Sequence, residues 1–203
     1  MGLDFNPKLR VNRYILPKFA TIGVTTIAVS FGLAACEGRN PFDIGWTQTP
    51  DTVLLYSFAR ELGLPSAFDF HGRVSRIVEA PLSAGLWDVM LDTQDDQLVF
   101  LLPEVLGIPS EARIIELPGL IFDDVREAPA DTTAYTSDEA VPLALGSVYV
   151  IRTKLGPDRF GLNCVFYAKM EALKIDVLVG TLRFVYDANP LCSDRDLIPP
   201  DKD

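Results

Sequence analysis

Large apolar residues recur at every second position near the end of this chain of 203 residues. In the segment 181–187 these residues are Leu182, Phe184 and Tyr186. Successive side chains of a strand point to opposite faces, so a period of two predicts a strand with one buried face. Two earlier strands, with turns near 156–158 and 176–180, are predicted at 147–153 and 163–172. Three consecutive antiparallel strands predict a C-terminal meander.

The middle of the chain also contains segments whose apolar patterns predict strands. The segment 68–78 predicts one half-buried strand with Gly72 near its middle, and 57–64 is the best helical candidate. A hairpin is expected from 86–91 and 98–102, and short strands are expected at 113–117 and 119–122. The acidic segment 123–140, interrupted by Pro129, predicts a long exposed loop. The expected fold is therefore mainly β, an antiparallel sandwich or rolled barrel.

A second pattern lies near the N-terminus, where 19–33 contains no charged residue and ends in Leu33-Ala34-Ala35-Cys36. Four basic residues precede it: Lys8, Arg10, Arg13 and Lys18. Basic, apolar and small residues in this order form an export signal. With cysteine at the cut, the pattern resembles the lipobox of bacterial lipoproteins. The resemblance implies a diacylglycerol on the sulfur of Cys36 and removal of the preceding peptide.

This reading divides the chain into three parts: a signal peptide or anchor helix over 1–35, a lipidated tether over 36–51 and an extracytoplasmic β domain over 52–203. An uncleaved anchor is the main alternative, since 19–35 approaches the length that crosses a bilayer. Both readings place the domain outside the cytoplasm, attached to a membrane at its N-terminal end. Whether that membrane is the inner or the outer one stays open.

Charge restricts the partners of the exported part. Beyond residue 36 the chain has 14 Lys and Arg against 27 Asp and Glu, a net charge of −13. Such a surface repels nucleic acid and anionic headgroups, so neither is expected as a partner. A basic patch on another protein would be attracted.

Two cysteines remain if Cys36 carries lipid. Cys164 and Cys192 form an even set in an oxidising compartment, which predicts a disulfide. A zinc site would compete, but two distant cysteines without neighbouring histidines are a poor ligand set.

The sequence contains little that indicates catalysis. A histidine can act as the base for a nucleophilic serine, but the sequence contains no G-x-S-x-G motif to provide that serine for its single histidine, His71. The acidic turns 92–96 and 194–196 lack the glycine and distal glutamate of a calcium loop, so solvated turns are the simpler interpretation. We therefore expect a protein that is not an enzyme, without a metal and with no cofactor other than the lipid on Cys36.

Three strand segments carry a further resemblance: Tyr149-Val150-Ile151-Arg152-Thr153, Tyr167-Ala168-Lys169 and Leu182-Arg183-Phe184. Over about 40 residues they look like the repeated strands of HmuY-like haem-binding lipoproteins. That resemblance implies an exported β-rich domain. Members of that family bind haem through two histidines, and this chain has only one. His71 with Met90 or Met170 is the remaining possible pair of axial ligands. No motif supports this pair, so no haem ligands are assigned.

Docking elements are expected outside the predicted strands. Phe42 and Trp46 lie in the tether, where they either pack onto the domain or face the membrane or a partner. Asp123 and Asp124 open the acidic loop, and Pro199–Pro200 lie in the tail. The expected function is an accessory subunit that docks on a membrane protein complex. The alternative is a haemophore- or carbohydrate-type binding lipoprotein, and an envelope enzyme comes third.

Overall fold

The computed structural model describes residues 46–199. The predicted N-terminal helix, Cys36 and Phe42 lie outside this range. Strands dominate the described part: β1 Asp51–Tyr56, β2 Ala67–Asp69, β3 Val74–Arg76, β4 Val89–Gln94, β5 Gln97–Leu101, β6 Arg113–Leu117, β7 Val141–Pro142, β8 Val148–Arg152, β9 Gly156–Pro157, β10 Asn163–Cys164, β11 Tyr167–Asp176 and β12 Thr181–Ala188. Three short 3-10 helices complete it: η1 Pro103–Leu106, η2 Phe122–Asp124 and η3 Thr132–Ala134.

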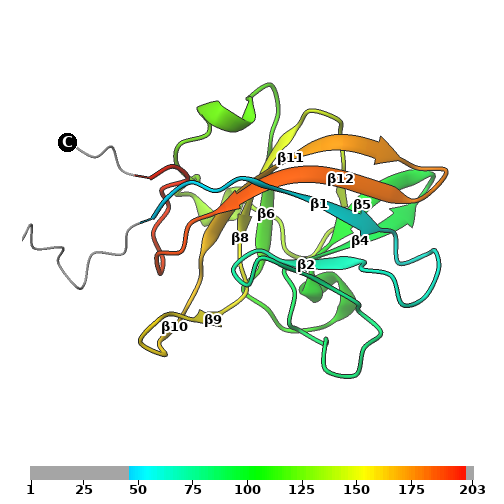
Figure 1. Ribbon diagram of the computed structural model, residues 1–203, viewed down its shortest axis with the longest axis horizontal. Helices are drawn as coiled ribbons and strands as arrows, with labels where there is room; N and C mark the ends of the chain where they lie inside the picture. Colours follow the sequence, from blue (N-terminus) through cyan, green and yellow to red (C-terminus); the bar gives the residue numbers. More distant parts are fainter. Residues whose placement is uncertain (1–45, 200–203) are drawn as a thin grey trace, which may run out of the picture. The chain divides into compact units, whose positions relative to one another are not determined.

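The strands form two five-stranded antiparallel sheets and a small β9–β10 ribbon (Figure 1). Sheet A has the order β1-β12-β11-β8-β6, and sheet B has the order β3-β2-β4-β5-β7. Neither sheet closes into a barrel within residues 46–199. The predicted mainly-β antiparallel fold is therefore confirmed, with the meander present as β8, β11 and β12.

One apolar core joins the two sheets. Leu182, Phe184 and Tyr186 of β12 are buried, as the alternation predicts. Their neighbours in the core include Phe68 of β2, whose ring meets that of Phe184 edge to face at 5.6 Å between centroids. Such aromatic pairs add to the free energy gained by burying apolar surface.

Three predicted elements are wrong, two of them in the segment 57–78. The segment 68–78 is a tight hairpin of β2 and β3 rather than one strand, because the Asp69 carboxylate accepts the Gly72 N–H at 3.0 Å and closes a turn. The segment 57–64 has no helix. Its first two N–H groups donate hydrogen bonds to distant strands and turns. The Ser57 N–H donates to the Gly180 carbonyl, and the Phe58 N–H donates to the Leu91 carbonyl. Tertiary hydrogen bonds here override a weak helical propensity.

The segment 123–140 contains no strand, in agreement with the predicted loop, but it is not exposed throughout. Val125, Ala128 and Tyr135 are buried against the outer face of sheet A. The ammonium group of Lys169 holds the start of this segment, donating to the carbonyls of Phe122 and Val125. The residues expected as a strand at 119–122 instead lead into η2.

Candidate functional site

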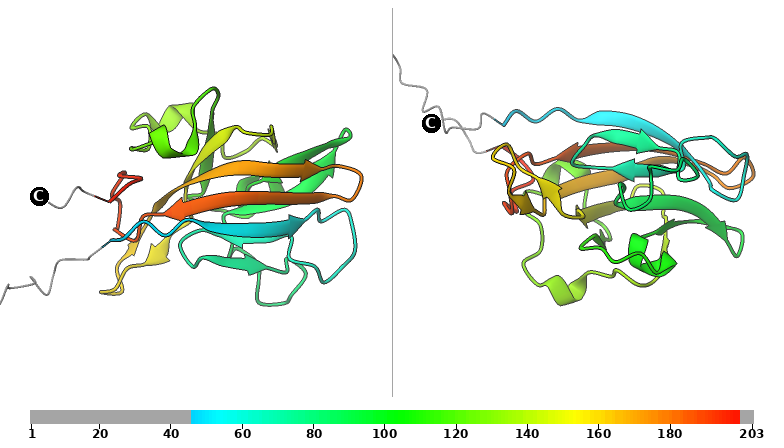
Figure 2. Two further views of the ribbon diagram at one scale, coloured as in Figure 1. Left: turned by 45° about the horizontal axis from the view of Figure 1, so that its top comes forward. Right: turned by 90° about the horizontal axis from the view of Figure 1, so that it is seen from below.

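The described chain begins and ends at one end of the two-sheet domain, which we call the proximal end (Figures 1 and 2). The β9–β10 ribbon lies at this end as well. A hollow of about 330 Å³ is lined by Trp46, His71 and Pro190. A second hollow of about 380 Å³ is lined by His71, Pro190 and residues 157–159. The two hollows share His71 and Pro190, so the first described residue and the ribbon lie near one another.

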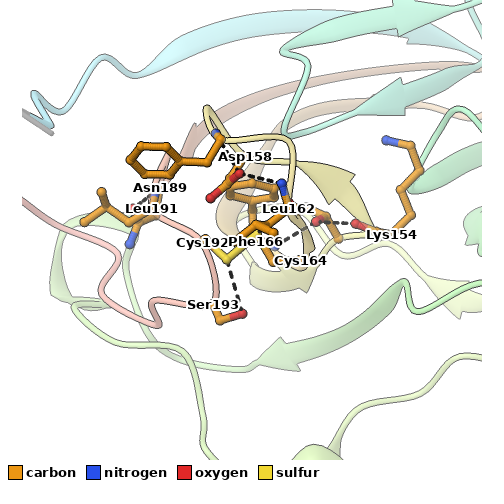
Figure 3. Close-up of a disulfide and its surroundings, with 11 residues drawn as sticks. Lys154, Asp158, Leu162, Cys164, Phe166, Asn189, Leu191, Cys192 and Ser193 are labelled. Carbon is orange, nitrogen blue, oxygen red and sulfur yellow. Dashed lines mark hydrogen bonds between the residues drawn. A yellow bond between two sulfur atoms is a disulfide. The ribbon is translucent and has the colours of Figure 1, made fainter. Parts of the chain in front are cut away.

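The Cys164–Cys192 disulfide fixes the tail to the ribbon (Figure 3). Cys164 belongs to β10, and Cys192 follows the end of β12 by four residues. Their Cα atoms are 5.7 Å apart, within the range that a disulfide spans. A backbone hydrogen bond from Ser193 to Val165 continues the attachment.

We call residues 155–163 the proximal hairpin. Its tip is held by Asp158, whose carboxylate accepts the N–H groups of Phe160 and Leu162, both at 2.8 Å. The Asp158 N–H donates to the Leu162 carbonyl at 2.8 Å, and the Gly161 N–H donates to the Asp158 carbonyl at 3.0 Å. The tip is therefore a closed set of internal hydrogen bonds.

This closed tip presents apolar side chains to solvent. Phe160 is 63% exposed and Leu162 is 65% exposed, and Leu155 at the start of the hairpin is also exposed. The guanidinium carbon of Arg159 lies 4.7 Å from the centre of the Phe160 ring. Large apolar side chains held in the open by a defined loop are typical of contact surfaces.

His71 supports the base of the hairpin. Its ring stacks on Phe166 with 3.7 Å between centroids. A β-carbon at Gly156 would come within 3.1 Å of the imidazole, so glycine makes this close approach possible. Burial lowers the pKa of His71, although Asp69 and a hydrogen bond with the Pro157 backbone oppose the shift. The neutral ring therefore has a packing role at this position.

Charged groups lie behind the hairpin. Lys154 Nζ donates to Asp69 at 2.7 Å and lies 3.9 Å from Asp88. Asp88 is fully buried, and its two oxygens accept the N–H groups of Phe70 and Lys154. Burial raises the pKa of Asp88 to about 6 despite the opposing charge of Lys154. This cluster ties β2 to the start of the hairpin.

Asp69 has the opposite shift. Burial acts to raise its pKa, but hydrogen bonds from Lys154, Gly72 and Arg76 outweigh that effect and leave the pKa below its usual value. Every carboxylate oxygen of Asp69 and Asp88 has a hydrogen-bond partner. Within residues 46–199 no three His, Cys, Asp or Glu side chains gather as a metal site.

A second group of exposed apolar residues lies at the opposite end of the domain, on the β11–β12 turn and the loop after β1 (Figure 1). We call it the distal patch: Phe58, Leu62, Leu178 and Val179. Leu178 is 90% exposed. Arg60 joins the two loops, donating to the Val177 carbonyl at 2.8 Å.

The residues expected to dock are separated by the structure. Trp46 is 6% exposed and packs onto the domain. Asp123 and Asp124 are exposed in η2, which contacts β11 on the outer face of sheet A. Met90 and Met170 are buried, Met170 in the core shared by the sheets, whereas His71 lines the two hollows at the proximal end.

The proximal hairpin and the distal patch were missed in the sequence. Their signal is visible afterwards: Phe160 and Leu162 stand in a stretch rich in turn residues, and Leu178 and Val179 stand directly before Gly180. Apolar residues in turns have no strand face to bury them. No protein-family model matches this chain, and no curated protein matches it significantly.

Proposed function

We propose that this chain is a lipid-anchored extracytoplasmic accessory subunit that docks on a membrane protein complex and catalyses no reaction itself. Its anchor is a diacylglycerol on Cys36, added before residues 1–35 are removed. Its two facing sheets are those of a β-sandwich. The single observation that carries the proposal is the Leu33-Ala34-Ala35-Cys36 motif, ten residues before a folded β domain with its own disulfide.

The disulfide supports export. A disulfide persists in an oxidising compartment, and the anchor motif sends the domain to one. No helix within residues 46–199 has the length and apolarity needed to cross a bilayer. In this proposal the lipid on Cys36 attaches the domain, confines it near membrane-bound partners and raises its effective concentration.

The distal patch is the docking surface in this proposal. Four large apolar side chains on two joined loops are a contact area that water solvates poorly. The patch is at the end opposite the one where the described chain begins, from which the tether leads back to Cys36 (Figure 1). A membrane complex with an extracytoplasmic domain would meet it there.

The test is a pull-down of the full, tagged protein from native membranes in mild detergent, read by mass spectrometry. We expect partner subunits in a fixed ratio and an N-terminal peptide that starts at acylated Cys36. The Leu178→Asp variant should lose at least tenfold of the partner, a change of about 1.4 kcal/mol in binding free energy. Leu82→Asp is the matched control, because Leu82 is comparably exposed at 85%.

Recovery of the wild-type protein alone, or from the soluble fraction without acylation, would contradict this function.

A ligand-binding module is the second candidate. It is favoured by the 330 Å³ hollow, where the buried Trp46 Nε1 has no hydrogen-bond partner within the described range. A small molecule co-eluting with the protein, and lost in His71→Ala, would favour it.

A further inference from the structure

We propose that the proximal hairpin enters the lipid headgroup region and is a second point at which the domain contacts the membrane. The inference rests on the proposed lipid anchor at Cys36. It assigns the exposed side chains of Phe160 and Leu162 to one partner, a bilayer surface of zwitterionic lipid.

The length of the tether brings this end of the domain to the membrane. Ten residue steps separate Cys36 from Trp46, and an extended chain spans at most about 3.6 Å per residue. Trp46 therefore stays within roughly 36 Å of the acylated sulfur, whatever path the tether takes. The hollow that Trp46 lines shares His71 and Pro190 with the hollow beside the hairpin. The tether thus leads to the end that carries Phe160.

The side chains at the tip suit the boundary between headgroups and acyl chains. Phe160 and Leu162 are apolar and exposed, and Arg159 lies beside the Phe160 ring. Aromatic and aliphatic side chains gain free energy on leaving water there, while a long cationic side chain keeps its charge at the headgroups. Leu155 adds apolar surface at the start of the hairpin.

The backbone N–H groups at the tip have hydrogen-bond acceptors within the hairpin and so do not depend on water. Entering a less polar layer is costly for amides that lose their hydrogen bonds to water. The N–H groups of Asp158, Phe160, Gly161 and Leu162 are already bonded within the hairpin. These four amides therefore need no solvent partner in the headgroup region.

Charge does not oppose the contact. The exported part of the chain has an excess of 13 acidic residues, but residues 155–163 contain one acid, Asp158, and one base, Arg159. The disulfide at the base of the hairpin keeps this neutral tip attached to the end of β12. A single lipid fixes where a domain is held and leaves its orientation free. A second contact at the hairpin would turn the distal patch away from the bilayer.

The experiment places a tryptophan at the tip of the full acylated protein, reconstituted in phosphatidylcholine vesicles with brominated acyl chains. The two native tryptophans are buried, Trp46 at 6% exposure and Trp87 at 0%, and are measured in the unsubstituted protein. Phe160→Trp should lose fluorescence relative to vesicles without bromine. Leu178→Trp in the distal patch is the matched control and should lose none.

Unchanged fluorescence at position 160, or equal quenching at 160 and 178, overturns the inference. A photocrosslink from position 160 to a protein in native membranes also overturns it and assigns the hairpin to a protein partner. The mass of the N-terminal peptide is read from the same sample. An acylated protein with an unquenched tip contradicts the hairpin contact alone, whereas a protein that lacks the acyl group contradicts the proposed function.

Discussion

The ammonium group of Lys169 is buried and donates a 2.8 Å hydrogen bond to the carbonyl of Phe122, with its nitrogen 4.6 Å from the centre of the Phe122 ring. It also bonds to the Val125 carbonyl. Burial lowers the pKa of Lys169, although the charges of Asp123 and Asp187 oppose the shift. These two bonds attach the start of the 123–140 segment to sheet A.

Replacing Lys169 by alanine should reduce the free energy of unfolding by about 2–4 kcal/mol, because two buried carbonyls lose their donor and a cavity forms. The measurement is urea denaturation followed by circular dichroism. Lys174→Ala is the matched control, since Lys174 lies on the same strand with its side chain exposed. Equal stability of the two variants would contradict the role of Lys169.

Asp88 should make stability depend on pH. Its folded-state pKa of about 6 lies above the ordinary value of 3.8. Its contribution is therefore fully present below pH 3.8 and is lost as the pH rises through 6, by about 3 kcal/mol in total. His71 has a lowered pKa, so its contribution has the opposite slope below pH 6.5.

The comparison that isolates Asp88 is between wild type and Asp88→Asn, measured by urea denaturation from pH 4 to pH 7.5. His71 is common to both proteins, so the difference between the two curves belongs to Asp88. We expect wild type to lose stability relative to the variant as the pH rises. A difference that is constant with pH would show that Asp88 has an ordinary pKa.

Removing the disulfide should destabilise the domain. The Cys164→Ser/Cys192→Ser variant opens a loop with a sequence separation of 28 residues. The chain-entropy model gives a loss of about 3–4 kcal/mol for a loop of this length. Guanidinium denaturation with and without reductant measures it. Reductant should lower the stability of wild type to that of the variant, while leaving the variant unchanged.

Asp158→Ala should loosen the proximal hairpin with little effect on global stability. The N–H groups of Phe160 and Leu162 would lose their acceptor and should exchange hydrogen faster, by about tenfold for each 1.4 kcal/mol lost. Hydrogen exchange by nuclear magnetic resonance measures both amides. Asp131→Ala is the control, because Asp131 accepts the Thr133 N–H in another exposed turn. Unchanged exchange at 160 and 162 would show that Asp158 does not hold the tip.

Much of the C-terminal half could be predicted from the chain. The strands at 113–117, 148–152 and 181–188 are close to their predicted ranges, and the turn near 176–180 is present. The segment 181–188 alternates because one face is buried in the core. The segment 148–152 is instead a continuous apolar run, because both of its faces are buried. Both patterns are typical of strands. The disulfide between Cys164 and Cys192 was predicted from cysteine number and is present.

The elements predicted wrongly are those whose local pattern was weak. The hairpin at β2 and β3 depends on a hydrogen bond from the backbone N–H of Gly72 to the Asp69 carboxylate. The spacing of apolar residues in the sequence gives no sign of this bond. The loop after β1 is fixed by backbone bonds to Gly180 and Leu91, far away in sequence. The burial of Val125 and Tyr135 depends on the outer face of sheet A, which no local pattern describes.

By itself the sequence determined the strand-forming periodicity, the acidic net charge, the two pairable cysteines and the motif at Cys36. Only the tertiary structure decided which apolar residues stay exposed. Phe160 and Leu178 lie in turns, and a turn residue is buried or exposed according to what the rest of the chain packs over it. Burial is a property of long-range contacts, so both groups of exposed apolar residues appeared only when the two sheets were in place.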